Sequence, residues 1–358
     1  MNVDGKHFQS IWFSEESETV HCIDQTKLPH DFVILELKNL DSVCHAIRAM
    51  QVRGAPLIGV AAAYGMYLAL KQDPQSYDSA RAALLATRPT AVNLQWALRQ
   101  MDAACAGSSG SQIQEASLKA AWILEAQDRQ ICESIGDHGA AILESLWQIK
   151  GSETVLNVLT HCNAGWLATV DWGTALSVIY KAHERGVPLH IWVDETRPRN
   201  QGASLTCWEL GKHGIAHTLI TDNAGGHLMQ HQQVDVCVVG SDRTTILGDV
   251  CNKIGTYLKA LAANDNGIPF YVALPVSSID FTMRDGSAEI PIEERDGSEV
   301  THIQGLSESG ELQSVLLSPA DVAVCNPGFD VTPARLITGI ITEKGVVDAN
   351  EQQIASLQ

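Results

Sequence analysis

The sequence predicts an α/β protein in which a small N-terminal β and helical domain, residues 1–150, precedes a mainly parallel, doubly wound sheet domain, residues 151–358. Apolar residues recur at helical spacing up to about Lys150, whereas beyond Gly151 short apolar runs alternate with helical stretches. Such alternation is typical of βαβ units and a parallel sheet. A chain of 358 residues is also long enough for two hydrophobic cores.

The first part is predicted to begin with a small antiparallel hairpin or meander. Two apolar and β-branched runs, IWFSEESETVHCI and DFVILEL, flank the turn-like DQTKLPHD. From Asp41 onward the apolar residues follow a helical period. We therefore expect helices in VCHAIRAM, LIGVAAAYGMYLAL, AVNLQWALRQMDAA and EASLKAAWILEAQDRQICESIGDHGAAILESLWQI.

The second part is predicted to alternate strands with helices. The expected strands are VLNVLTHC, PLHIWVDET, HTLITDN, VDVCVVGSD, PFYVALPVSS and DVAVCNPG, and the expected helices are TALSVIYKAHERG, LTCWELGKHG, NKIGTYLKALAAND and PARLITGIITEKG. Open α/β sheets bind ligands beyond the carboxyl ends of their strands. Polar residues follow the runs at 161–163, 194–197, 221–223, 241–243 and 326–328, so a site is expected at this edge.

Composition and motifs exclude several classes of protein. The formal net charge of −18 argues against a nucleic-acid partner, because such surfaces need excess Lys and Arg. No apolar stretch approaches the ~20 residues that cross a bilayer, and MNVDGKHFQS does not read as a secretory signal, so we expect a cytoplasmic protein without a membrane partner. Nine scattered cysteines are expected to be reduced thiols. Without CxxC, HExxH or GxGxxG, neither a metal nor a dinucleotide cofactor is expected.

Two residues at predicted strand ends are candidates for acid–base chemistry. Cys162 ends an apolar strand among polar neighbours, where a thiol can exchange protons, although most buried cysteines act as small hydrophobes. Asp242 follows VDVCVVG in the same relation to its strand. On position alone, a helix N-cap or an ion pair with Arg243 explains Asp242 equally well.

Three local signals favour anion binding. Arg53-Gly54-Ala55-Pro56 precedes a small-residue helix, whose free N–H groups favour a phosphate. Arg88 precedes another helix, and Asn252-Lys253 is predicted to open the helix NKIGTYLKAL with an amide and a point charge. Taken singly, each position is more often an ordinary helix start with a solvated side chain.

At these residues the sequence becomes recognisable. Along DQTKLP, RGAPLIG, RPTAVNL, THCNAG, DETRPRNQGA, DNAGG, GSDR, NKIGTY and IPIEERDGSEV it resembles the methylthioribose-1-phosphate isomerases of methionine salvage. That family is related to the regulatory subunits of translation initiation factor 2B and to ribose-1,5-bisphosphate isomerases. The resemblance implies a Rossmann-like second domain without a nucleotide, a homodimer, and a sugar-phosphate substrate turned over without a cofactor.

The resemblance also assigns roles to individual positions. Cys162 of THCNAG matches the family's catalytic cysteine, and Asp242 of GSDR matches its catalytic acid. The initiation-factor subunits generally lack this pair, so its presence favours the enzyme. The family's substrate-binding positions match Arg53, Gly54, Ala55, Arg88, Gln201, Asn252 and Lys253.

The implied reaction converts 5-methylthioribose 1-phosphate, an aldose, into 5-methylthioribulose 1-phosphate, a ketose. Because the anomeric phosphate blocks spontaneous ring opening, one group must protonate the ring oxygen and another must act at C2. We assign Asp242 as the principal acid/base and Cys162 as the second group. An aspartate has an ordinary pKa of ~3.9, so burial must raise it, and VDVCVVG with Ile246 and Leu247 is expected to supply the apolar surroundings.

The chain departs from the family pattern, and two other functions stay open. SDRTTILGDVC stands where a segment like ADRIAANGD is usual, and Ser204 and Cys207 replace common Arg and Ala. One alternative is an isomerase of 5-deoxyribose 1-phosphate or ribose 1,5-bisphosphate, although a bisphosphate needs a second cationic cradle. The other is a non-catalytic regulatory subunit. ARLITGIITEKGVV suits either a dimer interface or the core.

Overall fold

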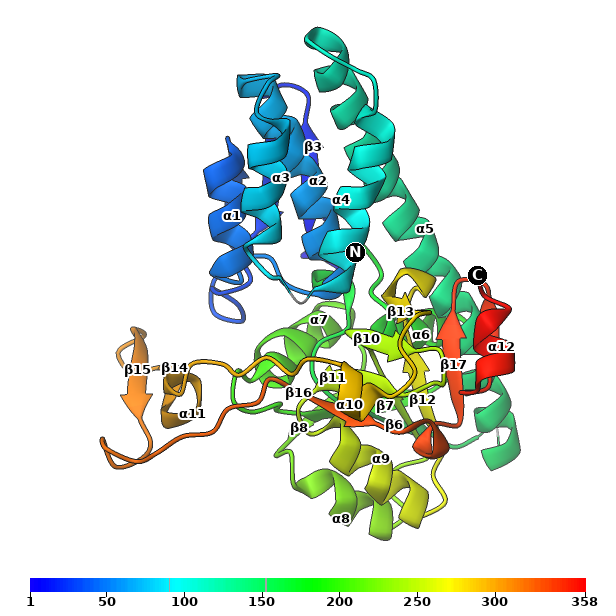
Figure 1. Ribbon diagram of the computed structural model, residues 1–358. Coiled ribbons are helices and arrows are strands. Elements are labelled where there is room, and N and C mark those ends of the chain that lie inside the picture. Colours follow the sequence, from blue (N-terminus) through cyan, green and yellow to red (C-terminus); the bar gives the residue numbers. More distant parts are fainter. Residues whose placement is uncertain (90, 152) are drawn as a thin grey trace.

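The computed structural model describes residues 1–89, 91–151 and 153–358, so residue 90 of the RPTAVNL segment and residue 152 lie outside the described part. Figure 1 shows a bundle of N-terminal helices on one side and a twisted sheet flanked by helices on the other. The chain therefore has the α/β fold that the sequence predicts. None of the described helices combines the length and apolar character that a membrane span requires.

The N-terminal strands form the predicted meander. β1 (Asn2–Val3) pairs with β2 (Lys6–His7), and β3 (Ile11–Ser14), β4 (Thr19–Ile23) and β5 (Ile34–Leu37) form an antiparallel sheet in that order. Alternate side chains of this sheet, including Ile11, Val20 and Cys22, are buried against the helices. Period-two alternation of this kind directs one face of the sheet toward this core, and on the other face Trp12 and Ile23 pack against the core of the sheet domain.

The helices that follow pack around the buried helix α2 (Ala55–Gln72). They are α1 (Leu40–Arg48), α2 (Ala55–Gln72), α3 (Tyr77–Leu85) and α4 (Val92–Cys105). α1 begins at a capping box, in which the Asn39 side chain accepts from the Ser42 N–H. α2 is buried from Leu57 to Leu70, because its small residues let α4 approach closely. The apolar sequence of α2 is therefore explained by burial in the protein core, and no described helix meets the criteria for a membrane span.

The long helix α5 (Ser111–Lys150) connects the two parts. Its 40 residues extend about 60 Å at 1.5 Å per residue. The N-terminal half packs against α2 and α4. In the C-terminal half, Gly136 and Gly139 let α6 (Ala175–Glu184) approach closely, because a Cβ at either position would meet Ser177 or Val178. The division at residue 150 stays a prediction, and α5 contributes to both cores.

The main sheet has seven strands in the order β18-β17-β12-β9-β6-β7-β8. All neighbouring pairs are parallel except β17 with β18. Successive residues of β9 pack into different cores. Val236 and Val238 join the side with α5 and α6, while Cys237 and Val239 join the side with α8 (Ala224–Gln230) and α9 (Thr256–Asp265). The strands are β6 (Leu156–Thr160), β7 (Leu189–Asp194), β8 (His217–Ile220), β9 (Val236–Val239), β12 (Phe270–Ala273), β17 (Gly339–Thr342) and β18 (Gly345–Val347).

The strand order creates a crevice between β6 and β9. The chain moves outward from β6 to β7 and β8, then returns to β9 on the other side and continues to β12 and β17. At such a switch point the connections leave in opposite directions, so a cavity opens beyond the strand ends. The helices and short helical turns of this part are η1 (Trp166–Ala168), the π-helix η2 (Gly202–Thr206), α7 (Cys207–Lys212), α8 (Ala224–Gln230), α9 (Thr256–Asp265), η4 (Ala334–Leu336) and α12 (Glu351–Ala355).

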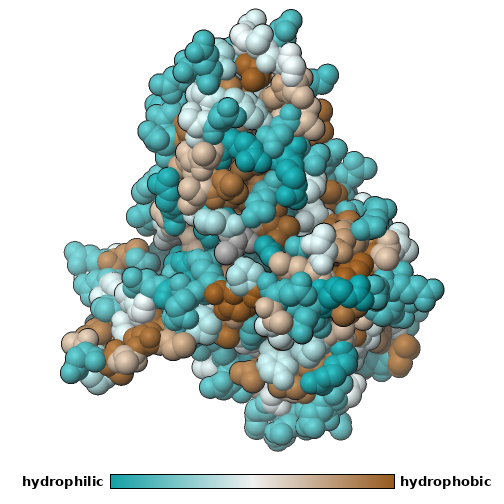
Figure 2. All heavy atoms as spheres, viewed as in Figure 1, coloured by the Kyte–Doolittle hydropathy of each residue, from teal (hydrophilic) through white to brown (hydrophobic). Residues whose placement is uncertain are grey.

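A smaller sheet and a projecting hairpin complete the fold. The small sheet has the order β13-β10-β11-β16, made of β10 (Arg243–Thr245), β11 (Val250–Lys253), β13 (Ile279–Asp280) and β16 (Phe329–Thr332). The hairpin β14 (His302–Leu306) and β15 (Leu312–Leu316) extends away from the sheet domain, and Figure 2 shows hydrophobic residues on its surface. Short helical turns, η3 (Val276–Ser278), α10 (Gly286–Glu289) and α11 (Ser298–Thr301), connect these elements.

Three predicted elements are wrong. PARLITGIITEKG was expected to be a helix, but it contains the whole of strand β17, whose residues are all buried. Residues 321–328, all of which the structure describes, form no strand, although DVAVCNPG has an apolar run. Asn252 and Lys253 lie in β11, and the helix begins only at Thr256. In the first and third cases pairing with distant residues decided the conformation, because β17 pairs with β12 and β11 pairs with β16.

Candidate active site

The crevice between β6 and β9 holds a cavity of about 70 Å³. It is lined by all the candidate catalytic and substrate-binding residues: Arg53, Gly54, Ala55, Arg88, Cys162, Gln201, Asp242, Asn252 and Lys253. The N-terminal part supplies the first four, from the start of α2 and the turns between its helices, and the sheet domain supplies the others. A wider hollow of about 450 Å³ shares Met50, Arg53 and Gln201 with this cavity. The sequence-predicted residues thus meet in one place, and their chemical roles remain predictions.

Cys162 lies two residues beyond the end of β6 in a left-handed backbone conformation, with φ of 68°. Its N–H donates to Thr196 Oγ1 at 2.8 Å, and its carbonyl accepts from Thr206 Oγ1 at 2.7 Å. These two bonds hold a conformation that non-glycine residues seldom adopt. Burial raises the pKa of the Cys162 thiol, and the positive charges of Lys253 and Arg53 oppose that rise.

Asp242 follows β9 and precedes β10, so it is not a helix N-cap. Its N–H donates to the Cys251 carbonyl at 2.9 Å, which ties it to β11. Burial raises the pKa of the Asp242 carboxyl, and Lys253, Arg88 and Arg53 oppose the rise in that order. A carboxyl group with a raised pKa can carry the proton that a general acid must donate.

The RGAP segment joins the helical part to the sheet part. Gly54 is the N-cap of α2 with φ of 103°, and an added Cβ would lie 2.3 Å from the Ala168 carbonyl oxygen. Only glycine therefore fits here, as the conformation and the close approach both require. The free N–H groups at the start of α2 face a cavity lined by Gly54 and Ala55, which suits an anion.

Arg53 is held by a buried acceptor that sequence reasoning missed. Its Nη1 donates to Asn163 Oδ1 at 2.5 Å, and its Nη2 donates to the Asn163 carbonyl at 2.7 Å. The Asn163 amide in turn donates to Glu209 Oε1 at 2.9 Å. Glu209 is fully buried and also accepts from two backbone N–H groups and the Tyr180 hydroxyl. Burial raises the pKa of Glu209.

Arg88 and Lys253 bring further positive charge to the cavity. Arg88 forms an ion pair with Glu293 at 3.0 Å, so it is not simply a solvated arginine. Lys253 is 8% exposed, donates to the Gly328 carbonyl at 3.0 Å and stacks over the Phe329 ring. Burial lowers the pKa of Lys253, while Cys162 and Asp242 oppose that change.

Gln201 and Asn252 offer amides to the cavity. Gln201 lies at the start of η2, a π-helix of the kind often found at functional sites, and its buried Oε1 has no hydrogen-bond partner among the described residues. The Asn252 amide donates to Thr256 Oγ1 at 3.0 Å. Although Asn252 opens no helix, its place in β11 still puts it on the cavity wall.

Ile246 and Leu247 do not have the expected position. Both lie in the turn between β10 and β11, and they pack into the core that contains α9 and β12. The cavity wall near Asp242 instead includes Ala164, Pro275 and Phe329. Neither Ile246 nor Leu247 lines the cavity, and their contribution to the apolar surroundings of Asp242 stays a prediction.

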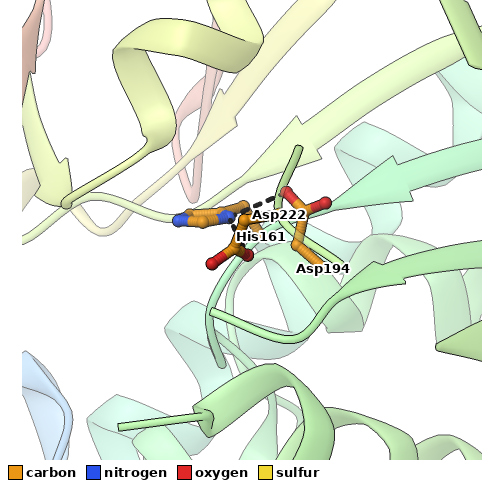
Figure 3. A group of neighbouring side chains, drawn as sticks. All are labelled: His161, Asp194 and Asp222. Carbon is orange, nitrogen blue, oxygen red and sulfur yellow. Dashed lines mark hydrogen bonds and ion pairs between the residues drawn. The ribbon is translucent and has the colours of Figure 1, made fainter. Parts of the chain in front are cut away.

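His161, Asp194 and Asp222 form a second group that sequence reasoning noted only as strand-end residues (Figure 3). Their ligand atoms lie within 4.8 Å of one another, and His and Asp are ligand types found at metal sites. A cation already occupies this position, however, because Lys259 Nζ lies 3.2 Å from Asp194 Oδ2. The residues present do not fit a metal site.

The model of the Initiation factor 2 subunit family matches residues 51–349. Two similar proteins are the methylthioribose-1-phosphate isomerases of Rhodospirillum rubrum, 56% identical over 100% of this chain and 93% of that protein, and of Methylorubrum extorquens, 57% identical over 100% and 98%. A crystal structure of 5-methylthioribose 1-phosphate isomerase from Pyrococcus horikoshii is 37% identical, with a TM-score of 0.84 over 98% of this chain and 96% of that one. A structure of the eIF-2B delta subunit from A. fulgidus is 38% identical, with a TM-score of 0.77 over 96% of each chain.

Proposed function

Since the chain belongs to the methylthioribose-1-phosphate isomerases, within the wider Initiation factor 2 subunit family, we propose that it converts 5-methylthioribose 1-phosphate into 5-methylthioribulose 1-phosphate in methionine salvage. One observation supports this most strongly. A thiol and a carboxyl group, both with raised pKa values, face the same small cavity beside Arg53, Arg88 and Lys253. Proton-handling groups next to an anion-binding wall are what isomerisation of a sugar phosphate requires.

The substrate phosphate is assigned to the helical side of the cavity. Arg53 and Arg88 offer N–H donors there, and the start of α2 adds backbone N–H groups. Both arginines are already oriented, by Asn163 and by Glu293, so little side-chain freedom is lost when the phosphate binds. Fixing the phosphate also fixes C1 and C2 of the sugar near the sheet side.

The chemistry is assigned to the sheet side. Asp242 in its protonated form gives a proton to the ring oxygen as the C1–O bond breaks. One hydrogen then moves from C2 to C1, and the C2 hydroxyl gives its proton to the Asp242 carboxylate, with the Cys162 thiol as the second proton-handling group that can pass it on, so both groups return to their starting state. This sequence conserves every atom and needs no external oxidant or reductant. A proton transfer through an enediol and a hydride shift both satisfy the balance.

The wider hollow supports the methylthio sugar over a bisphosphate. Arg199, which lines that hollow, forms an ion pair with Glu299 at 2.8 Å. The carboxylate neutralises the charge that a second phosphate would need. Leu28, Pro29 and Leu205 on the same wall are better suited to an apolar 5-substituent.

Assembly and location are part of the proposal. We propose a homodimer in the cytoplasm, supported by exposed apolar side chains on and beside the β14–β15 hairpin and by nine free thiols. Light scattering over a range of concentrations tests the dimer, and a constant monomer mass would contradict it. The exposed side chains are Leu306, Leu312, Val315, Leu316 and Leu317.

The proposed reaction is tested by turnover of the purified full chain on three aldose phosphates. We expect the highest kcat/KM for 5-methylthioribose 1-phosphate, a lower one for 5-deoxyribose 1-phosphate and the lowest for ribose 1,5-bisphosphate. A higher kcat/KM for the bisphosphate would assign a different substrate. The absence of turnover on all three would favour the regulatory-subunit alternative, to which the similarity with the A. fulgidus protein gives some weight.

A further inference from the structure

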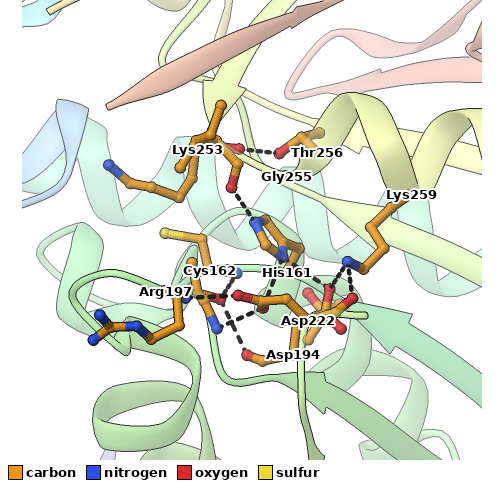
Figure 4. Close-up of polar contacts among 12 residues, drawn as sticks. His161, Cys162, Asp194, Arg197, Asp222, Lys253, Gly255, Thr256 and Lys259 are labelled. Carbon is orange, nitrogen blue, oxygen red and sulfur yellow. Dashed lines mark hydrogen bonds and ion pairs between the residues drawn. The ribbon is translucent and has the colours of Figure 1, made fainter. Parts of the chain in front are cut away.

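The His161 side chain connects three segments that surround the candidate active site. His161 directly follows β6, is 1% exposed, and places Nδ1 at 2.8 Å from Asp194 Oδ2 at the end of β7. Its Nε2 lies 2.8 Å from the carbonyl oxygen of Ile254, just after β11. Figure 4 shows the ring between Asp194 and the turn that carries Lys253 and Gly255. One imidazole therefore joins the ends of β6, β7 and β11.

The two partners engage both ring nitrogens. A backbone carbonyl can only accept, so Nε2–H donates to Ile254. Nδ1 lies at hydrogen-bond distance from the Asp194 carboxyl group. Both nitrogens therefore have a partner within the protein.

Lys259 and a second carboxylate, Asp222, complete the network. Lys259 Nζ lies 3.2 Å from Asp194 Oδ2 and also donates to the Asp222 carbonyl. Asp222 accepts from the N–H groups of Thr196 and Arg197, at 2.8 and 2.7 Å. Thr196 is the residue whose hydroxyl receives the Cys162 N–H. The network thus reaches Cys162 through His161, which precedes it in sequence, and through Thr196, which accepts its N–H. Figure 4 shows Cys162 beside His161.

The other end of the ring reaches Lys253. Ile254 directly follows Lys253, so the bond from Nε2 fixes the backbone that carries this buried ammonium. Gly255 gives independent support, because its φ is 100° and an added Cβ would lie 3.0 Å from His161 Cε1 and 3.1 Å from Nε2. The turn after β11 therefore has room for the His161 ring only because residue 255 is glycine.

We propose that His161 is a positioning residue that holds the Lys253 turn against the Cys162 turn, so that ammonium and thiol face the substrate at a fixed spacing. The proposal rests on the proposed isomerase function, in which both groups line the substrate cavity. His161 is not assigned as an acid or base in this proposal, because both of its ring nitrogens already have partners within the protein. Lys253 is the largest influence opposing the raised pKa of Cys162, so the spacing matters chemically.

Two conservative variants separate the two bonds of the ring. In His161→Gln the amide NH₂ can reach the Nε2 position and keep the bond to Ile254, whereas in His161→Asn it can reach the Nδ1 position and keep the bond to Asp194. His138→Gln is the matched control, because His138 is a half-buried histidine of α5 that also contacts a backbone carbonyl, that of Thr342. Thermal unfolding of each purified variant reports whether it folds.

We expect His161→Asn to lose about 100-fold in kcat, since a misplacement of about 1 Å can cost this much, with KM changed less than about threefold. His161→Gln should lose less, because it keeps the link to the Lys253 turn, and His138→Gln should keep parental kinetics. Parental kcat in both His161 variants would overturn the proposal. So would a greater loss in Gln than in Asn, or a loss accounted for by the unfolded fraction.

A second readout does not depend on turnover. Alkylation of Cys162 by iodoacetamide, followed by peptide mass spectrometry over a pH series, reports the pH midpoint of thiol reactivity, with exposed Cys325 as the internal standard. We expect the midpoint for Cys162 to rise in His161→Asn, because Lys253 would no longer be held nearby. An unchanged midpoint would overturn the proposal. If the parental chain turned over no sugar phosphate, this measurement would still judge the role of His161 separately.

Discussion

On the sheet side of the cavity, Cys162 and Asp242 are held through their backbones, whereas on the helical side Arg53 and Arg88 are held through their side chains. Backbone bonds to Thr196, Thr206 and Cys251 fix the first pair beyond β6 and β9.

The second pair depends on side-chain partners, Asn163 for Arg53 and Glu293 for Arg88. Because of this difference, substitutions on the two sides of the cavity are expected to have different consequences for the surrounding structure. Substitution on the sheet side removes a reacting group without altering the backbone that carried it. Substitution on the helical side removes charge and leaves an acceptor without its donor.

The largest effect is expected on the sheet side. Cys162→Ser and Asp242→Asn should each fold normally and lose at least about 100-fold in kcat, the lower range for a general acid or base. Steady-state kinetics with 5-methylthioribose 1-phosphate, together with thermal unfolding, checks this. Near-parental kcat at unchanged stability would remove that residue from the mechanism and weaken the contrast between the two sides.

The helical side should respond in KM instead. Arg53→Ala and Arg88→Ala should each raise KM by about ten- to a hundred-fold, since a hydrogen bond to a charged group is worth about 1.5–3 kcal/mol. The rise should be similar for every 1-phosphorylated pentose that is turned over.

Arg81→Ala is the control for these arginine variants, because Arg81 pairs with Asp102 on the helical part outside the cavity lining. An arginine variant that discriminates between 5-methylthio and 5-deoxy sugars while keeping its KM would mean that the substrate is oriented the other way round.

A smaller effect is expected where the two parts meet. Asp128 of α5 accepts from the Val170 N–H at 2.6 Å, and burial raises its pKa to about 7. Because this pKa is higher in the folded than in the unfolded state, the folded state binds more protons between the two values. The contribution of Asp128 to stability is therefore complete below pH ~4 and is lost as the pH rises through about 7.

Asp128→Asn should remove this slope. Urea unfolding at pH 5 and pH 8 should show the variant gaining free energy of unfolding relative to the parental chain at the higher pH. Asp137→Asn, an exposed carboxylate on the same helix, serves as the control. The same difference between variant and parent at both pH values would contradict the assignment, and activity at saturating substrate should be unaffected because Asp128 lies outside the cavity.

Sequence periodicity predicted those elements whose conformation depends on residues close together in the chain. The meander, the long helix α5 and the alternating strands follow from periodicity. The family motifs identified the candidate residues that line the cavity. The run Gly339–Thr342 is apolar on both sides, so it has no period that distinguishes a buried strand from a helix.

Other features depend on distant partners. Asn252 and Lys253 are in a strand because they pair with Asp330 and Phe329, far along the chain. The contacts of Glu209 and Asn163, and those of His161, likewise cross between elements, so no window of sequence contains them. A charged residue within a helix pattern, such as Glu209 in LTCWELGKHG, gave no local sign that it would be fully buried.

The central claim is that Cys162 and Asp242 act on one substrate as a unit, and the double variant Cys162→Ser/Asp242→Asn tests it most directly. Its kcat with 5-methylthioribose 1-phosphate is compared with that of each single variant under the same conditions. Residues that act as a unit show strongly non-additive losses, so we predict that the double variant loses no more than about threefold beyond the more impaired single variant. A loss equal to the product of the two single losses would show that the two groups act independently, which contradicts the account.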